Sequence, residues 1–302
     1  MQLDRLHQAP FSSTFMGAVR GALNHYGIGV TDAFVYGASG HAFAMNIHNQ
    51  LCPSGPYCFD RAPILALLEN VGLHTASLGF FHGGSSADER DHAEVQMRDA
   101  LESGEPCMLV NMEFQLITGC DETAFLTAQP WPGHDFPPAR LTYGSWSELG
   151  EEVHINFYVF RRGRIVAHRA AARAALAYAV DLWRNPTAHS AGDYGMGPDA
   201  YTNWKSAVEA GHGTGHGCWW NGMVWSESRT RAGEYFREIA PLLPDPSAAD
   251  PLADHYAAVG SLLHSCADKE ATPEAKLAHL TEAEAHEIEA IAKIEAILQQ
   301  MG

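Results

Sequence analysis

Apolar residues near the N-terminus recur every three or four positions, which is the spacing of one face of an α-helix. These residues are Phe15, Val19, Ala22, Leu23 and Tyr26. Gly27 follows directly, and glycine adopts the left-handed conformation that commonly ends a helix. The pattern predicts a helix that begins at the hydroxyl-bearing residues 12–14 and ends before Gly27.

Two further helices are expected before the pattern changes. The stretch Pro63–Val71 has Asp60 ahead of it and Gly72 behind it, residue types that typically flank a helix. The stretch 87–102 has a similar helical pattern. Both segments are predicted to be helical.

The pattern then changes to short apolar runs separated by turn residues, which is typical of β-strands. The runs are 107–112, 114–119, 124–128 and 153–160, with a turn at 119–122 and a proline-rich loop at 129–138. In the last run, alternate positions predict one apolar strand face, made by Val153, Ile155, Phe157 and Val159. These segments predict an antiparallel sheet.

Beyond Arg164 the apolar positions return to helical spacing, and no further strand is expected. Two helix starts are predicted, one from the Thr281/Glu284 capping box and one from Asp250 as a cap before Pro251. The fold class is therefore α+β, with an N-terminal domain over residues 1–165 and an all-α domain over 166–302.

The composition is that of a globular protein large enough for one large core or two smaller ones. The chain has 302 residues, of which 46% are hydrophobic and 18% charged. It shows no signal-peptide pattern and no apolar run of about eighteen residues, so neither secretion nor a membrane span is expected. Six cysteines in such a chain are typical of reduced thiols, which favours a cytoplasmic location.

The formal charge of -17 argues against nucleic acid as a partner, because binding phosphates depends on lysine and arginine. From Pro241 onward the chain has eleven acidic residues and three lysines, a pattern typical of a solvated surface. The amphipathic C-terminal helix is also suited to pairing with a second copy in a homodimer.

The start of the first predicted helix is a candidate site. A helix N-terminus presents main-chain N–H groups and a partial positive charge, which can stabilise a nucleophile or an oxyanion. Here the available side chains are the hydroxyls of Ser12, Ser13 and Thr14, and a hydroxyl needs a neighbouring base to attack a substrate. The alternative is that one of them is only the helix N-cap.

Three short segments carry a family resemblance. They are Gly37-Ala-Ser-Gly-His-Ala-Phe43, Leu51-Cys-Pro-Ser-Gly55 and Phe114-Gln-Leu-Ile-Thr-Gly-Cys-Asp121. From Ser12 to about Phe160 the chain resembles the N-terminal domain of butirosin biosynthesis protein H and its relatives, which are similar to bacteriocin-processing, papain-like cysteine peptidases. The resemblance implies a papain-like fold, and the helical second half looks like the region that accompanies such domains.

The resemblance implies a cysteine at the start of the first helix, a histidine at the start of a strand and an Asp-Pro pair after it. Thr14, flanked by Ser12 and Ser13, stands at the cysteine position, Gln115 at the histidine position and Gln129-Pro130 at the Asp-Pro position. Glutamine cannot accept a proton near neutral pH. Thiol-peptidase chemistry is therefore not expected.

Relatives of this type are implicated in transferring an acyl group from a carrier protein to an amine. The resemblance thus implies an acyl- or amide-transfer enzyme of natural-product biosynthesis, with a small amine or acyl substrate and an acyl-carrier protein as a partner. The alternative is a catalytically inactive ligand-binding or accessory protein of such a pathway. Neither hypothesis requires a cofactor.

Other residues complete the predicted site. His41 follows a glycine-rich turn and is the preferred acid or base, although a turn histidine is more often a surface group. Ligand contacts are expected from residues of the resembling segments, from two cysteines of a Pro/Gly loop and from two adjacent indoles. These are Ser39, Phe43, Cys52, Cys58, Asp121, Trp219 and Trp220.

Each of these ligand contacts has a structural alternative. A buried, inert thiol is the commoner state of a cysteine, Asp121 is suited to fixing a turn, and the two tryptophans are equally suited to core packing. The glycine-rich segment before the tryptophans is expected to be a loop that closes over the groove.

The best candidate cluster for a metal site is His212 and His216, with His189 upstream and Cys218 downstream. Two glycines between the first two histidines disfavour a helix that would place both imidazoles on one face. No metal is therefore expected.

Overall fold

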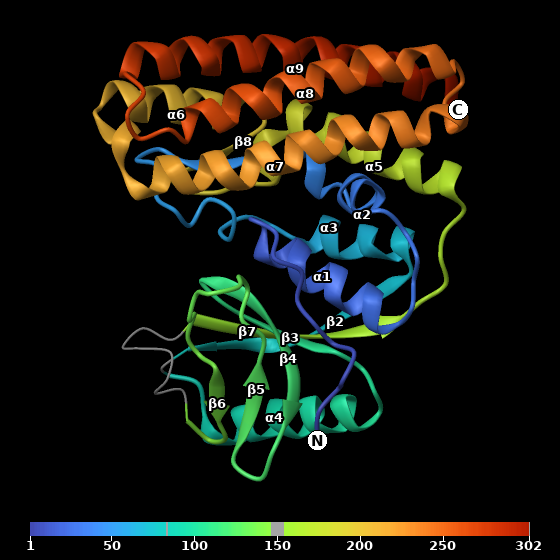
Figure 1. Ribbon diagram of the computed structural model, residues 1–302, viewed down its shortest axis with the longest axis vertical. Coiled ribbons are helices and arrows are strands. Elements are labelled where there is room, and N and C mark those ends of the chain that lie inside the picture. The colour runs from blue at the N-terminus through green and yellow to red at the C-terminus, as the bar shows by residue number, and fades with distance from the viewer. Residues whose placement is uncertain (83, 146–153, 302) are drawn as a thin grey trace. The chain divides into compact units, whose positions relative to one another are not determined.

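The computed structural model describes residues 1–82, 84–145 and 154–301, and the chain divides into two compact units (Figure 1). The sheet unit comprises Met1–Val30 and Gly72–Ile165. The helical unit comprises Thr31–Val71 and Val166–Gly302. The predicted boundary at residue 165 coincides with one passage between units, but residues 31–71, assigned from sequence to the first domain, belong to the helical unit.

Residues 31–71 join the helical unit because their partners lie there. Helix α2 (Asp32–Ala38) and the short 3₁₀ helix η1 (His41–Phe43) pack against α7 (His216–Ile239). Strand β1 (Asn46–His48) pairs with β8 (Tyr194–Met196). Contacts distant in sequence, which no local pattern reports, decide this assignment.

The sheet unit is built on an antiparallel sheet that has six strands within the described residues, in the order β2-β7-β3-β4-β5-β6. The strands are β2 (Leu73–His82), β3 (Cys107–Asn111), β4 (Glu113–Cys120), β5 (Ala124–Thr127), β6 (Arg140–Thr142) and β7 (His154–Arg162). An antiparallel sheet together with a C-terminal helical region confirms the predicted fold class at this coarse level.

Two of these strands have no counterpart in the sequence prediction. Strand β2 contains a register shift between Ser77 and Gly79, and most of its residues are exposed or half-buried, so it lacks a clear alternation. Strand β6 is only three residues long. Both strands are recognisable only through their pairing with neighbours.

One face of the sheet is covered by helix α4 (Ala87–Glu102), whose bounds match the prediction. Ile155, Phe157 and Val159 of β7 are buried in one cluster with Met97 and Leu101 of this helix. The predicted apolar face of the strand is confirmed for these three residues, and Val153 lies outside the described residues.

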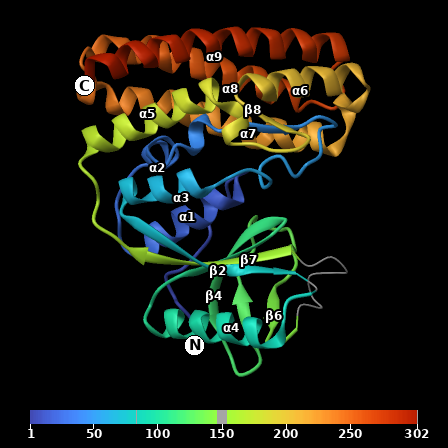
Figure 2. The same ribbon diagram turned by 180° about the vertical axis from the view of Figure 1, so that it is seen from behind.

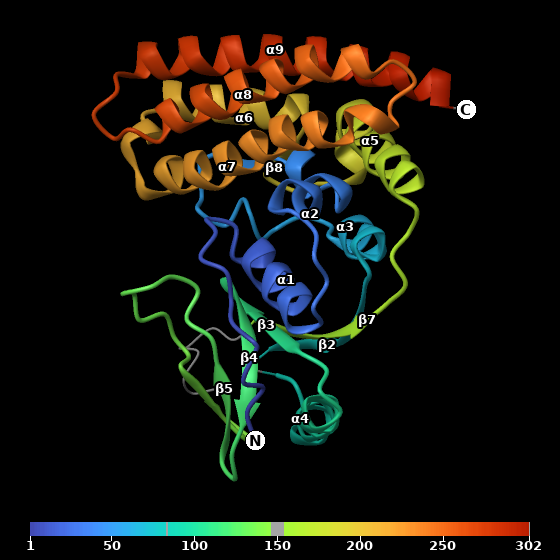
Figure 3. The same cartoon turned by 45° about the vertical axis from the view of Figure 1, so that its right-hand side comes forward.

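The opposite face is covered by helix α1 (Thr14–His25), as Figure 3 shows. Phe15 packs edge-on against Phe114 of β4, with ring centroids 5.1 Å apart. A Cβ atom on Gly21 would lie 2.5 Å from the Leu116 side chain, so glycine permits the close approach of helix and strand. The predicted helix is confirmed, and Gly27 follows it with φ +66°.

The helical unit consists of α-helices, short 3₁₀ helices and the β1–β8 pair. Its remaining α-helices are α3 (Ala62–Leu67), α5 (His168–Arg184), α6 (Pro198–Glu209), α8 (Ala249–Cys266) and α9 (Pro273–Met301). Its remaining 3₁₀ helices are η2 (Leu68–Val71), η4 (Pro186–Ala188), η5 (His212–Thr214), η6 (Ala240–Leu242) and η7 (Pro246–Ala248). The expectation that no strand follows residue 165 is wrong, because the three-residue β8 pairs with β1.

Helix α9 packs against α8, α5 and α6 (Figure 2). It begins at Pro273, so the predicted start at Thr281 is wrong. The Thr281 hydroxyl donates to the Leu277 carbonyl 2.8 Å away, as mid-helix threonines do. Helix α8 begins at Ala249, which places Asp250 in the first turn and not at the cap. Within the described residues, no helix is long and apolar enough to cross a membrane.

Candidate functional site

The start of α1 provides the site in the sheet unit. Ser13 is the N-cap, and its hydroxyl accepts a hydrogen bond of 3.4 Å from the Met16 N–H. The capping role expected for one of the three hydroxyl residues therefore belongs to Ser13. Thr14 is the first helical residue, and its side chain does not cap the helix.

The hydroxyl of Thr14 contacts the beginning of β4. Its Oγ1 donates to Oε2 of Glu113 at 2.5 Å and accepts from the Phe114 N–H at 3.1 Å. Glu113 reaches this position because β3 and β4 are joined by a single residue, Met112, with φ +60°. A hydroxyl at a helix N-terminus is thus paired with a carboxylate.

Gln8 fastens the helix start to the strand. Its Nε2 donates to the carbonyls of Phe114 at 2.8 Å and Thr14 at 3.3 Å. Its Oε1 accepts from the Leu116 N–H at 2.9 Å. One side chain therefore holds the relative position of Thr14 and β4.

Gln115 does not face this hydroxyl. Phe114 and Leu116 contact α1, so the residue between them points to the other face of the sheet. Gln115 is also directly opposite Leu109, which belongs to the cluster under α4. Gln115, which the resemblance placed at the histidine position, therefore lies on the other face of the sheet from Thr14, and the partner of Thr14 in the sheet is Glu113.

The Gln115 side chain instead ties down the loop that follows β5. Its Nε2 donates to the carbonyls of Ala128 at 3.0 Å and Pro138 at 3.2 Å. Gln129 helps to shape the same loop, because its Oε1 accepts from the Phe136 N–H at 2.5 Å. Both glutamines hold main chain in place.

Glu113 escaped the sequence prediction, because no local pattern points to it. The apolar residues at 114 and 116 identify the helix-facing side of the strand. That alternation turns both 113 and 115 away from the helix, and Glu113 meets Thr14 because it lies at the very start of the strand, next to Met112 with its positive φ.

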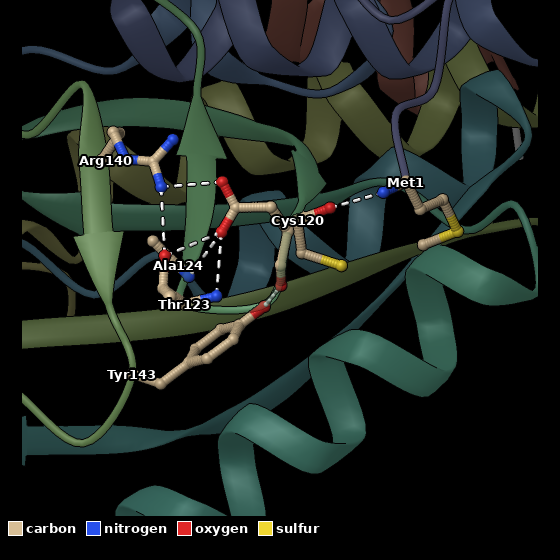
Figure 4. Close-up of polar contacts among 7 residues, drawn as sticks. Met1, Cys120, Thr123, Ala124, Arg140 and Tyr143 are labelled. Carbon is tan, nitrogen blue, oxygen red and sulfur yellow. Dashed lines mark hydrogen bonds and ion pairs between the residues drawn. The ribbon is translucent and has the colours of Figure 1, made fainter.

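Asp121 shapes the turn between β4 and β5, and Figure 4 labels four residues that bond to it, Thr123, Ala124, Arg140 and Tyr143. Its carboxylate accepts from the N–H groups of Thr123 and Ala124 at 2.9 and 3.0 Å, and from Arg140 at 2.7 Å. These contacts, led by the Thr123 N–H, hold the pKa of Asp121 well below its usual range. Tyr143 donates to the Asp121 carbonyl at 2.9 Å, so Asp121 has the turn-fixing role.

His41 lies in the helical unit, in η1. It is only 1% exposed, and the rings of Tyr36 and Trp225 lie 5.7 and 6.1 Å from its own. Burial, followed by the charges of Arg61 and Arg229, lowers the pKa of His41 to about 3. The alternative of a surface histidine is wrong, and the buried imidazole is a poor proton acceptor at neutral pH.

The neighbours of His41 in the resembling segment are buried too. The Ser39 hydroxyl donates to the Tyr36 carbonyl at 3.1 Å and accepts from the His41 N–H at 3.4 Å, which fixes the turn. Phe43 is 3% exposed and contacts the aromatic rings of α7 and α8. In the helical unit, both residues have a packing role.

The two predicted indoles lie on the first turns of α7, and the glycine-rich segment before them contains η5 and the first residues of that helix. Trp220 is buried and donates from Nε1 to the Tyr57 hydroxyl at 2.9 Å. Trp219 is half-buried, with the Lys269 ammonium 5.5 Å from its ring centre. Trp220 thereby anchors the loop that carries Cys52 and Cys58, whose thiols are half-buried and exposed, respectively.

The histidines considered for a metal have other surroundings. His212 lies in η5, whereas His216 opens α7. His189 contacts Asp181 at 2.7 Å, and the Cys218 thiol donates to the Cys266 carbonyl at 3.4 Å. In the part of the chain that the structure describes, no three His, Cys, Asp or Glu side chains form a metal-binding group.

Comparison of the chain with protein-family models gives no match, and comparison with curated proteins gives none either. The family resemblance therefore stays a prediction that rests on the three sequence segments.

Proposed function

We propose that this protein is an acyl- or amide-transfer enzyme of small-molecule biosynthesis, with Thr14 as the nucleophile and Glu113 as the base. The observation that carries the proposal is the 2.5 Å hydrogen bond from Thr14 Oγ1 to Glu113 Oε2 at the N-terminus of α1. A hydroxyl within hydrogen-bond reach of a base is the arrangement that nucleophilic catalysis requires. In this proposal the sheet unit is a degenerate papain-like scaffold of the butirosin protein H type.

In the proposed reaction the Thr14 oxygen attacks the carbonyl carbon of an acyl thioester while its proton passes to Glu113. The resulting oxyanion is stabilised by main-chain N–H groups of the first helix turn. The carbon–sulfur bond then breaks, and the thiol leaves with the proton held by Glu113. An amine next attacks the acyl-Thr14 ester, which gives an amide and restores the hydroxyl.

Two features of the site support this order of events. The Phe114 N–H, 3.1 Å from Thr14 Oγ1, stabilises negative charge that develops on that oxygen. Gln8 holds the helix start against β4, so the hydroxyl and the carboxylate stay aligned. A thioester carried on an acyl-carrier protein is the proposed donor, and a small amine is the proposed acceptor.

A second candidate function is that of a catalytically inactive ligand-binding or accessory protein of the same kind of pathway. Thr14 is only 1% exposed, and both of its hydrogen bonds also serve to join α1 to β4. In that case the hydroxyl is a structural group and a bound amine or acyl compound is not transformed.

The test uses the full chain with an acyl-N-acetylcysteamine thioester and a primary amine. Release of free thiol and formation of the amide are followed together, and intact-protein mass spectrometry detects the acyl adduct. Variants Thr14→Val and Glu113→Gln remove the nucleophile and the base. Thr14→Ser keeps a hydroxyl at the same position and is the matched control.

The proposal expects thiol release that is retained by Thr14→Ser and lost in the other two variants, with an acyl adduct on the peptide that contains Thr14. Thermal stabilisation by the thioester or the amine, without an adduct or thiol release in the wild type, overturns the enzyme proposal and supports the binding function. Equal thiol release by the wild type and Thr14→Val excludes Thr14 as the nucleophile.

A further inference from the structure

Two cysteines of the helical unit lie in one short loop that follows β1. Cys52 is half-buried and Cys58 is exposed, and both are free thiols. The other four cysteines, also free, are buried and lie outside this loop. The loop therefore concentrates the accessible thiols of the chain.

The loop folds back on itself in two successive turns. The Gly55 N–H donates to the Cys52 carbonyl at 3.4 Å, and the Cys58 N–H donates to the Ser54 carbonyl at 3.0 Å. The turns bring the two ends of the loop toward the same neighbour, Tyr194 of β8.

Both cysteines are connected to the Tyr194 hydroxyl, Cys52 through Ser54 and Cys58 directly. The Ser54 hydroxyl lies 2.8 Å from the Cys52 sulfur and 2.7 Å from the Tyr194 oxygen, so it links the two. The Cys58 thiol hydrogen-bonds to the same tyrosine hydroxyl. Burial, and after it this thiol, raises the pKa of Tyr194 to about 12, so its hydroxyl keeps its proton at neutral pH.

The main chain at each cysteine is held by an asparagine. Asn46 Nδ2 donates to the carbonyls of Gly55 at 2.9 Å and Cys58 at 3.0 Å. Asn221 Nδ2 donates to the Cys52 carbonyl at 3.1 Å. Because the loop is already ordered, joining its two thiols costs less chain entropy than joining two thiols of a flexible segment.

We propose that Cys52 and Cys58 form a reversible thiol–disulfide pair that is oxidised by hydrogen peroxide. The exposed Cys58 sulfur attacks one peroxide oxygen, which gives a sulfenic acid and one water. The Cys52 sulfur then attacks the Cys58 sulfur, which forms the disulfide and releases the second water. Two thiols are oxidised by two electrons in total, and the peroxide is reduced to two waters.

The test treats the reduced full chain with stoichiometric peroxide, blocks remaining thiols with iodoacetamide and digests the protein with trypsin. Both cysteines fall in the tryptic peptide 21–61, which lies between Arg20 and Arg61. The expected product is this peptide without alkylation and two hydrogen atoms lighter than its reduced form. Chymotryptic cleavage after Tyr57 should give two fragments that separate only after reduction.

Variants sharpen the test. Tyr194→Phe removes the hydroxyl that bonds to Cys58 directly and to Cys52 through Ser54, and it should slow disulfide formation about fivefold, the effect of one lost hydrogen bond. Tyr57→Phe removes a hydroxyl in the same loop that contacts Trp220 and should leave the rate unchanged. Cys52→Ser removes the second thiol, so the reaction should stop at the Cys58 sulfenic acid and no disulfide should form within the peptide.

Two results overturn the inference. One is a wild-type peptide in which both cysteines are still alkylated after peroxide treatment. The other is oxidation of Cys58 to the sulfinic acid with Cys52 still reduced. The proposal does not depend on Thr14 chemistry, since the peptide mass is measured without acyl substrate.

Discussion

Acidification should destabilise the helical unit through His41. The imidazole is buried, and its pKa is about 3 in the folded protein against a reference value of 6.5. The unfolded chain therefore binds a proton at His41 at pH values where the folded chain does not. The contribution to stability is full above pH 6.5 and is lost as the pH falls from 6.5 toward 3.

The size of the effect follows from the shift in pKa. Each unit corresponds to about 1.4 kcal/mol, so the loss between pH 7 and pH 5 is about 2 kcal/mol. The full loss near pH 3 is about 5 kcal/mol, an upper limit because the buried site can relax. A loss of this size is a large fraction of the stability of a typical domain.

The assay is urea unfolding at a series of pH values from about 7.5 down to about 4.5, a range that covers the first part of this loss. Tryptophan fluorescence reports on the helical unit, because five of the seven tryptophans lie in it. The wild type is compared with His41→Gln, which has no titrating group at this position. Subtracting the two curves removes the contribution of the sixteen other histidines.

The wild type should lose about 2 kcal/mol more than His41→Gln between pH 7 and pH 5. A second variant, His41→Phe, should show the same shallower pH dependence whatever its absolute stability. Parallel curves for the wild type and both variants would refute the reasoning, because His41 would then have the same pKa in the folded and unfolded chains.

Three further predictions concern stability. Glu287→Gln leaves the buried Arg229 without its carboxylate partner and should cost about 3–5 kcal/mol in urea unfolding, with the double variant R229M/E287L less affected than the single one. Gly37→Ala places a Cβ atom 2.0 Å from the Tyr235 ring and should lower the free energy of unfolding in urea by about 1–3 kcal/mol. A smaller side chain at position 235 should recover part of this stability. Thr14→Val removes the hydroxyl contacts to β4 and should lower the free energy of unfolding by about 1–3 kcal/mol. Thr14→Ser keeps the hydroxyl and should unfold at nearly the same urea concentration as the wild type.

Local patterns predicted the elements that bury one continuous apolar face. Helix α1, helix α4 and strand β7 are examples, because each has its apolar residues at the helical or strand period. The same reasoning missed β2 and β8, which depend on pairing with distant strands. It also placed the start of α9 at Thr281, although this Thr-x-x-Glu sequence lies inside the helix.

For the candidate site, too, some features follow from the sequence and others only from the tertiary structure. The sequence by itself determined that hydroxyl residues begin α1, because a helical period and a following glycine define that start. Only the tertiary structure decided that Glu113, and not Gln115, meets Thr14, since this depends on the turn at Met112 and on where the start of α1 packs against β4. It also decided that His41 is buried and neutral, because the residues that enclose it come from segments far apart in the chain.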